Sequence, residues 1–167
     1  MEKAPRIISR LGLVAHPDEG GYFRETYRSR HSLVGESLPP AYKQPRSLAT
    51  AIYFLLTADT CSRMHRLPGD EIFHFYGGDP VEMLLLKSDG SGEVNIIGGD
   101  VLSGQSPQLL VPAGCWQGAR LRPGGEYALL GTTMSPGYEA VDFTTGDGAQ
   151  LCREYPAYAE MIEVLTA

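Results

Sequence analysis

Three residues able to transfer protons stand close together in an otherwise apolar stretch, at His65, Glu71 and His74. Imidazole and carboxylate groups commonly act as general acids and bases in enzymes. A histidine polarised by a neighbouring carboxylate can remove a proton from a carbon next to a carbonyl group. We therefore expect His65, His74 and Glu71 to be the catalytic residues, if the protein is an enzyme.

Residues that share a strand face with these three are candidates for ligand binding. Arg63 precedes His65 by two positions and so shares its face of an extended strand. Tyr76 shares the face of His74 in the same way. Glu71 and His74 are three positions apart, so both can face one cup only if a bulge shifts the register.

Polar residues outside this stretch complete the expected binding site. The amide of Gln117 can both donate and accept hydrogen bonds from a polar ligand. Arg24 and Arg63, together with Arg28, could hold an anionic group such as phosphate or carboxylate. The alternative for these arginines is a role in salt bridges at the surface or in a dimer.

A divalent metal is a further possibility, although the sequence leaves its presence unknown. His65, Glu71 and Gln117 offer one nitrogen and two oxygen ligands, which could hold Mn, Fe or Ni weakly. We therefore name no cofactor, and treat a metal held by these three side chains as the less favoured case.

The composition excludes several classes of function. The 167 residues are enough for a sizeable core, and we expect 1–167 to form a single domain. A net charge of -6 lacks the excess of positive charge that nucleic-acid-binding proteins use to contact phosphates. No apolar run approaches the roughly 20 residues of a membrane span. The cysteines are widely spaced and odd in number, and no secretion signal precedes them, so we expect reduced thiols in a cytoplasmic protein.

Turn-forming residues divide the chain into about nine short strands. The catalytic stretch is expected to form a strand, a tight turn at 68–70 and a return strand at 71–76. The other strands are expected at 22–29, 48–56, 81–87, 93–97, 109–111, 115–121, 126–133 and 141–143. This spacing is typical of a β-sandwich or a jelly-roll barrel.

Short helices are expected at both ends of the chain. Apolar residues recur at helical spacing after Pro5, at Ile7, Ile8 and Leu11. The tail has the pattern of an amphipathic helix, at Tyr158, Met161, Ile162 and Leu165. Residues 31–46 are expected to form a long loop that serves as a lid, a dimer arm or neither.

The sequence resembles the cupin superfamily, and within it the cupin-5 group, a cupin-like domain of unknown function. His65, Glu71 and Gly78 match the first superfamily motif, whereas Leu67 stands where a second histidine would be. The segment 112–117 matches the second motif, Pro-x-Gly-x-x-His, except that it ends in Gln. Longer strings similar to the cupin-5 group follow one another at 16–29, 50–56, 70–80, 111–119 and 135–138.

This resemblance implies an all-β fold, the cupin double-stranded β-helix or jelly-roll barrel, commonly assembled as a homodimer. The resemblance does not predict a particular reaction, because the activity of the cupin-5 group is poorly defined. Distant structural relatives include epimerases that act on nucleotide-linked 4-keto-6-deoxy sugars. By analogy with those enzymes, Tyr138 could act as a catalytic acid.

Three functions remain open on these grounds. In the first, a homodimeric cupin binds a small polar molecule, sugar-like or anionic, in its barrel. In the second, an epimerase or isomerase acts next to a carbonyl of a free or nucleotide-linked sugar, with His65 or His74 as the base. The third is a metal-dependent cupin enzyme. No nucleic acid and no membrane is expected as a partner.

Overall fold

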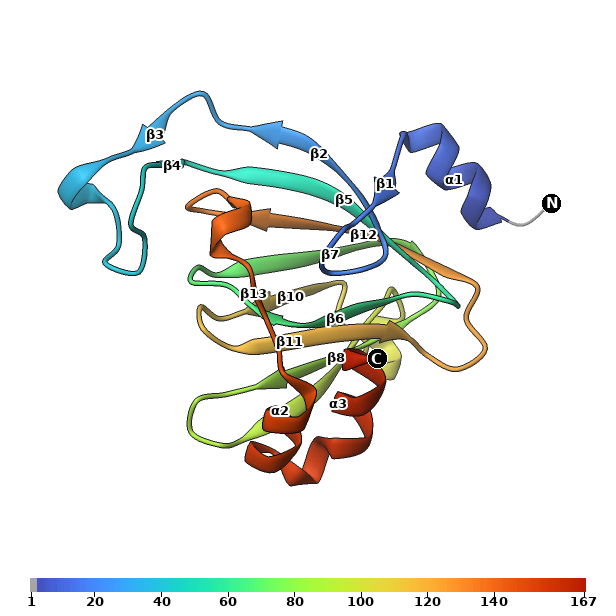
Figure 1. Cartoon of the computed structure of the whole chain (residues 1–167). Coiled ribbons are helices and arrows are strands. Elements are labelled where there is room, and N and C mark those ends of the chain that lie inside the picture. Colours follow the sequence, from blue (N-terminus) through green and yellow to red (C-terminus); the bar gives the residue numbers. More distant parts are fainter. Residues whose placement is uncertain (1–2) are drawn as a thin grey trace.

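Two antiparallel sheets face each other in the computed structural model, which describes residues 3–167 (Figure 1). The first sheet has six strands, in the order β1 (Val14–Ala15), β2 (Tyr22–Arg28), β5 (Thr50–Thr57), β12 (Tyr127–Met134), β7 (Glu71–Gly78) and β10 (Gln108–Val111). The second has five, in the order β13 (Thr144–Thr145), β6 (Cys61–Arg66), β11 (Trp116–Leu121), β8 (Val81–Leu86) and β9 (Gly92–Ile97). The expectation of an all-β jelly-roll barrel is confirmed.

The strands β6 and β7 do not form the hairpin that the sequence predicts. β6 pairs with β11 and β13, whereas β7 pairs with β12 and β10 in the other sheet. The turn between them therefore carries the chain from one sheet to the other. This crossing matters for the site, because it lets residues close in sequence approach one another from opposite walls.

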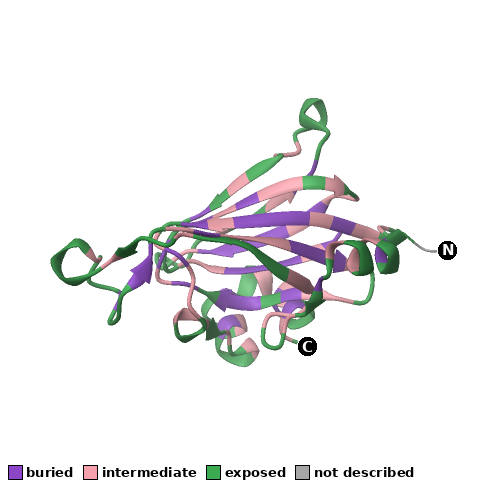
Figure 2. Cartoon of the chain, turned by 90° about the horizontal axis from the view of Figure 1, so that it is seen from above, coloured by how far each residue is buried: buried purple, intermediate pink, exposed green. Residues whose placement is uncertain are grey.

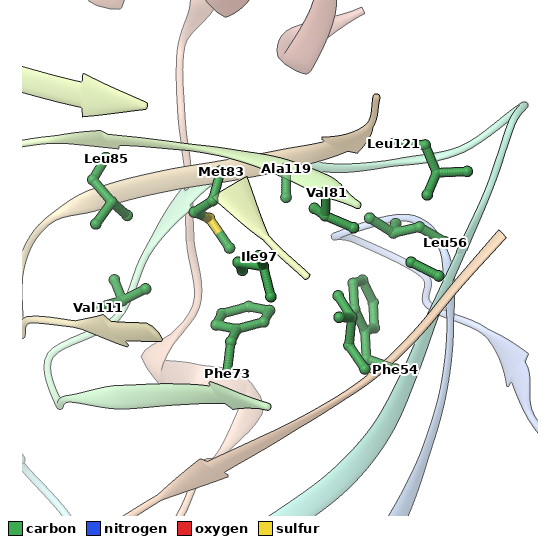
Figure 3. Close-up of a cluster of buried hydrophobic side chains, with 12 residues drawn as sticks. Phe54, Leu56, Phe73, Val81, Met83, Leu85, Ile97, Val111, Ala119 and Leu121 are labelled. Atoms are coloured by element: carbon green, nitrogen blue, oxygen red, sulfur yellow. The ribbon is translucent and has the colours of Figure 1, made fainter. Parts of the chain in front are cut away.

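Apolar side chains from the inner faces of both sheets fill much of the space between them (Figure 3). The six-stranded sheet contributes Phe54 and Phe73, and the five-stranded sheet contributes Met83 and Leu85. Alternation along each strand explains this arrangement, since every second residue of a strand points to the same face. The buried positions recur along the central strands in Figure 2.

The two C-terminal helices cover the outer face of the five-stranded sheet. The N-terminal helix α1 (Lys3–Leu11) and the C-terminal helix α3 (Ala159–Thr166) confirm the predicted terminal helices, and α2 (Gly148–Glu154) is an addition. Met64, Leu84 and Leu86 pack outward from this sheet against Leu151 and Ile162 of α2 and α3. On the six-stranded sheet, α1 lies beside Tyr127 and Leu129 of β12, and the C-terminal helices lie on the other sheet (Figure 1).

Two other segments differ from the sequence-based expectation. The predicted loop at 31–46 contains strands β3 (Ser32–Leu33) and β4 (Arg46–Ser47), which pair with each other in an arm that projects from the barrel (Figures 1 and 2). The strand expected at 141–143 is instead a single helical turn, Ala140–Asp142, and β13 follows it. Across residues 3–167, no helix combines the length and the apolar character needed to cross a membrane.

Candidate functional site

A cavity of about 260 Å³ opens between the two sheets at the end of the barrel where β5 and β7 begin and β2, β6 and β12 end. Its polar lining comes from His16, Glu19, His65, Glu71, Thr132 and Tyr138. Its apolar lining includes Phe23, Ile52, Leu67, Met134 and Phe143. A small apolar cup with a few convergent polar groups is the usual form of a ligand site.

His65 lies near the end of β6, with 1% of its surface exposed. Its Nδ1 lies 2.7 Å from the backbone oxygen of Arg63. The imidazole stacks on Phe143, with ring centroids 4.7 Å apart and planes 15° apart. Burial lowers the pKa of His65 from its ordinary value, and this effect outweighs the opposing attraction of Glu71. The ring is therefore neutral at pH 7 and able to accept a proton.

Glu71 is the first residue of β7, in the sheet opposite to that of His65, and it is buried beside Gln117 of β11. Gln117 Nε2 donates a 2.8 Å hydrogen bond to Glu71 Oε2. Burial raises the pKa of Glu71, and the carboxylate of Glu19 raises it further. The other amide atom of Gln117, Oε1, is buried without a partner among the described residues.

A glycine-rich loop brings His16 and Glu19 to the cavity. The amides of Asp18 and Glu19 both donate to His16 Nδ1, at 3.3 and 2.9 Å. Glu19 Oε1 accepts a hydrogen bond from Ser62 Oγ, and burial raises the pKa of the carboxyl group. Gly20 has a φ of +92°, and a Cβ there would lie 2.5 Å from the oxygen of Cys61. The loop can therefore press against β6 only with glycine at this position.

The segment 138–143 also lines the cavity. Burial raises the pKa of Tyr138 to about 12, so its hydroxyl keeps its proton at neutral pH. Tyr138 lines the cavity together with His65 and Glu71. Arg46 Nε donates to Asp142 Oδ2 at 2.9 Å, and this buried ion pair ties the segment to the arm.

Three of the predicted site residues lie on the outer face of the six-stranded sheet. Inside β7, Glu71 and Phe73 point inward, so His74 and Tyr76 fall on the outer face of the six-stranded sheet. His74 Nε2 lies 2.9 Å from Thr133 Oγ1, and its ring is parallel to that of Tyr76. The bulge in β7 comes only after His74 and so does not turn it inward. Arg24 lies on the same outer face, over the ring of Tyr53.

Arg63 is also separated from His65, although the sequence predicts a shared face. A register shift in the pairing of β6 with β11 interrupts the alternation between these two residues. Ser62 takes the inward position, whereas Arg63 is exposed, with Nη1 3.4 Å from the oxygen of Asp18. Among the predicted site residues, the structure therefore brings together His65, Glu71 and Gln117.

These three side chains do not fit a divalent metal. The amide of Gln117 is directed with its nitrogen toward Glu71, which is the wrong pole for a shared cation. His65 binds a backbone carbonyl through Nδ1, so Nε2 is the ring nitrogen it has available. Within residues 3–167, no group of three or more His, Cys, Asp or Glu side chains is arranged to hold a metal ion.

Sequence reasoning missed His16 and Glu19 as site residues. Both lie in the segment 16–21, which the sequence predicts as a loop before the strand at 22–29. The adjacent glycines, Gly20 and Gly21, were the available clue, because two successive glycines permit a close approach to a neighbouring strand. Nothing in the loop pattern indicated which strand it would approach.

Comparison with known proteins identifies several similar chains. The family model described as "Cupin superfamily (DUF985)" matches residues 5–146. The uncharacterized protein YML079W of Saccharomyces cerevisiae is 28% identical over 147 residues, which cover 83% of this chain and 73% of the yeast protein.

Solved structures give the same result. Protein SO0799 from Shewanella oneidensis superposes with a TM-score of 0.87 at 31% identity, over 100% of this chain and 99% of that one. A hypothetical protein from Leishmania major gives 0.86 at 32% identity, with 98% of each chain covered. Oxalate decarboxylase from Bacillus subtilis shares only the fold, with a TM-score of 0.56, 13% identity and coverage of 92% of this chain and 37% of that one.

Proposed function

Starting from the fact that this chain belongs to the cupin superfamily, we propose that its barrel binds a small, uncharged, sugar-like molecule. The observation that carries this proposal is the polar wall at the inner end of the cavity. His65 and Glu71 line it, and Gln117 donates to the Glu71 carboxyl group. A ligand hydroxyl that reaches this wall can form hydrogen bonds with the imidazole and carboxyl groups, which are costly to leave unpaired when buried.

The charges around the cavity favour an uncharged ligand over an anion. Arg28 is the arginine that lines it, and its guanidinium donates to Glu25 and Glu139. Arg24 and Arg63, which the sequence offered for an anionic group, lie elsewhere. A phosphate entering the cavity would instead meet the carboxyl groups of Glu19 and Glu71.

The size of the cavity agrees with this choice. Drug-sized ligands occupy pockets of about 300–1,000 Å³. The cavity here holds about 260 Å³, so it suits a monosaccharide rather than a nucleotide-linked sugar.

A second candidate function, an isomerase or epimerase acting next to a carbonyl, is favoured by the state of His65. Its pKa is lowered by burial, so it is a neutral base at pH 7. Tyr138, on the facing wall, retains its proton and could return one to a product. The binding function requires no turnover, so the two candidates differ in whether C–H bonds break.

Binding can be tested by saturation-transfer NMR with a panel of free pentoses, hexoses and the corresponding sugar phosphates. We expect free sugars to give transfer signals that vanish in His65→Ala, and sugar phosphates to bind more weakly. Thermal unfolding of the variant provides the control for folding, because His65 is buried. A variant that folds and binds sugars as the wild type does would remove His65 from the site.

We also propose that the partner of this chain is a second copy of itself, docked on the outer face of the six-stranded sheet. The C-terminal helices cover the other sheet, and α1 reaches this face beside Tyr127 and Leu129 of β12 (Figure 1). It exposes Tyr27, Tyr76 and Leu110, each with half or more of its surface accessible. Aromatic residues of this kind are enriched in interfaces. Carboxylates are sparse on this face, so two copies of a chain with a net charge of -6 can meet here without strong repulsion.

Light scattering tests this association directly. We expect a dimer for the wild type and a monomer for Tyr76→Glu, because two buried carboxylates would face each other across the two-fold axis. Val94→Glu, on the other sheet, is a matched exposed control that should stay dimeric. A monomeric wild type would contradict the proposal.

A cytoplasmic location is supported by the cysteines. Cys61, Cys115 and Cys152 are free thiols in the structure. Unpaired cysteines are typical of proteins in reducing compartments.

A further inference from the structure

Two histidines line the same cavity and are fixed by their Nδ1 atoms in opposite hydrogen-bonding roles. His16 comes from the loop before β2, and His65 comes from β6. Both rings pack near Phe143, with centroid distances of 6.1 Å for His16 and 4.7 Å for His65. A neutral imidazole carries one proton, so the role of Nδ1 determines the role of Nε2.

In His65, Nδ1 must carry the proton. Its neighbour at 2.7 Å is the backbone oxygen of Arg63, which can only accept a hydrogen bond. The proton is thereby assigned to Nδ1, and Nε2 is left with a free lone pair. His65 therefore presents an acceptor on the edge away from its own strand.

In His16, the same reasoning gives the opposite result. Its Nδ1 faces the backbone N–H groups of Asp18 and Glu19, at 3.3 and 2.9 Å, and both of these can only donate. Nδ1 is therefore unprotonated and the proton is on Nε2. Burial lowers the pKa of His16, so this neutral form is the one present at pH 7. His16 presents a donor on its free edge.

We infer that His16 and His65 form a donor–acceptor pair for an α-hydroxy carbonyl compound, a small free ketose or aldose in its open-chain form. His16 Nε2–H donates to the carbonyl oxygen, and His65 Nε2 faces the proton on the adjacent carbon. The inference rests on the proposed function, because it assigns a substrate class to the same cavity. It adds His16 as a catalytic residue.

The proton transfer balances without any further reactant. His65 Nε2 takes the proton from the carbon next to the carbonyl, and the C–H electron pair forms the new carbon–carbon double bond. The π pair of the carbonyl moves to its oxygen, where the His16 Nε2–H stabilises the charge of the enediolate. Return of the proton by His65 to the same carbon, from the same side, regenerates the starting sugar. Isomerisation follows when His65 instead protonates the former carbonyl carbon, while the hydroxyl proton of the enediolate moves to the former carbonyl oxygen and the neighbouring oxygen becomes the new carbonyl.

The two tautomers can be measured without any ligand. Long-range proton–nitrogen correlation NMR of the full-length protein, with histidine labelled and assigned by His16→Asn and His65→Asn, reports which ring nitrogen carries the proton. We expect Nε2–H for His16 and Nδ1–H for His65 at pH 7.5. The same tautomer in both rings would overturn the inference.

Substrate class is tested by comparing ketoses with the polyols that lack only the carbonyl group. The probes are dihydroxyacetone against glycerol, and D-xylulose against xylitol. We expect each ketose to bind about tenfold more tightly than its polyol, which corresponds to one hydrogen bond to a buried donor. In deuterium oxide the protein should also exchange the C–H protons next to the carbonyl for deuterium faster than buffer alone.

Two asparagine variants separate the roles. The oxygen of His16→Asn can still accept from the loop amides, and the nitrogen of His65→Asn can still donate to the Arg63 carbonyl. Each variant loses only Nε2. We expect His16→Asn to remove most of the preference for ketose over polyol, and both variants to lose exchange. Equal binding of ketose and polyol to the wild type would overturn the inference and leave the proposed sugar-binding function standing. Failure of all four compounds to bind would overturn both.

Discussion

Gln117 Nε2 donates a 2.8 Å hydrogen bond to Glu71 Oε2, and this bond joins the five-stranded sheet to the six-stranded sheet inside the barrel. Both side chains are buried, at 1% and 7% exposure. In the motif that the sequence resembles, a histidine would stand at position 117. With glutamine there, a position that could hold a metal-binding histidine instead forms a hydrogen bond between the two sheets.

Removing one partner of the Gln117–Glu71 hydrogen bond should destabilise the fold. Gln117→Leu leaves the Glu71 carboxyl group buried without its donor, and we expect a loss of about 1–3 kcal/mol in the free energy of unfolding. Urea denaturation at pH 7 measures it. The double variant Gln117→Leu/Glu71→Leu should recover part of the loss, because no unpaired carboxyl group remains. A double variant that is less stable than the single one would show that the pair contributes a net attraction.

The raised pKa of Glu71 predicts how stability depends on pH. The folded state binds this proton more tightly than the unfolded chain, whose carboxyl group titrates near 4.5. The contribution of Glu71 is therefore fully present below pH 4.5 and is lost as the pH rises through its higher folded-state pKa. We expect wild type to gain stability relative to Glu71→Gln as the pH falls from 7 toward 4.5.

The comparison with Glu71→Gln is needed because other buried groups titrate in the opposite sense. The pKa values of His16 and His65 are lowered, so their contribution is lost as the pH falls below 6.5. The contribution of His16 is common to both proteins, whereas that of His65 also changes, because Glu71 attracts its charged form. A difference that does not vary between pH 7 and 4.5 would contradict a raised pKa for Glu71.

The ion pair between Arg46 and Asp142 should hold the arm and the cavity wall together. The two side chains are 3% and 7% exposed. Asp142→Leu leaves a buried guanidinium uncompensated and should cost about 3 kcal/mol. Chemical denaturation measures the loss. Arg46→Met/Asp142→Leu is the control, and it should be more stable than Asp142→Leu alone. Amide hydrogen exchange should rise at 138–143 in the single variant.

Gly20 should tolerate no side chain, whereas Gly124 should tolerate one better. Both have positive φ, at +92° and +88°, so an alanine at either position strains the backbone. At Gly20 a Cβ would also collide with the Cys61 oxygen, whereas at Gly124 nothing lies within 4 Å. We expect about 1 kcal/mol of destabilisation for Gly124→Ala, and clearly more for Gly20→Ala. Thermal unfolding distinguishes them, and equal losses would mean that the loop moves away freely.

Much of the architecture was predictable from local sequence patterns. Turn residues and the apolar residues between them predict β8, β9 and β12 close to their observed bounds. Both signals are local, because alternate residues of a strand face the same side and turns interrupt the strand. The terminal helices α1 and α3 follow from their helical spacing. The sequence motifs also identify the barrel type, through the resemblance that the family match bears out.

The partners of each strand could not be predicted in the same way. β6 and β7 look like a hairpin because a turn separates two strands, and a turn of this kind serves equally well to cross between sheets. The choice depends on which distant strands compete for pairing, here β11 for β6 and β12 for β7. Those contacts lie far along the chain and leave no local pattern.

The sequence by itself determined that His65, Glu71 and Gln117 occupy matching motif positions in a β-rich chain. Only the tertiary structure decided which polar groups share the cavity. A register shift in β6 separates Arg63 from His65, and regular alternation at the start of β7 sends His74 to the outer face. The loop of His16 and Glu19 joins the cavity because the backbone of β6 lies against its glycines. The physical reason is that residue spacing fixes a side chain's face within one strand, whereas the walls of a cavity are set by long-range packing between strands.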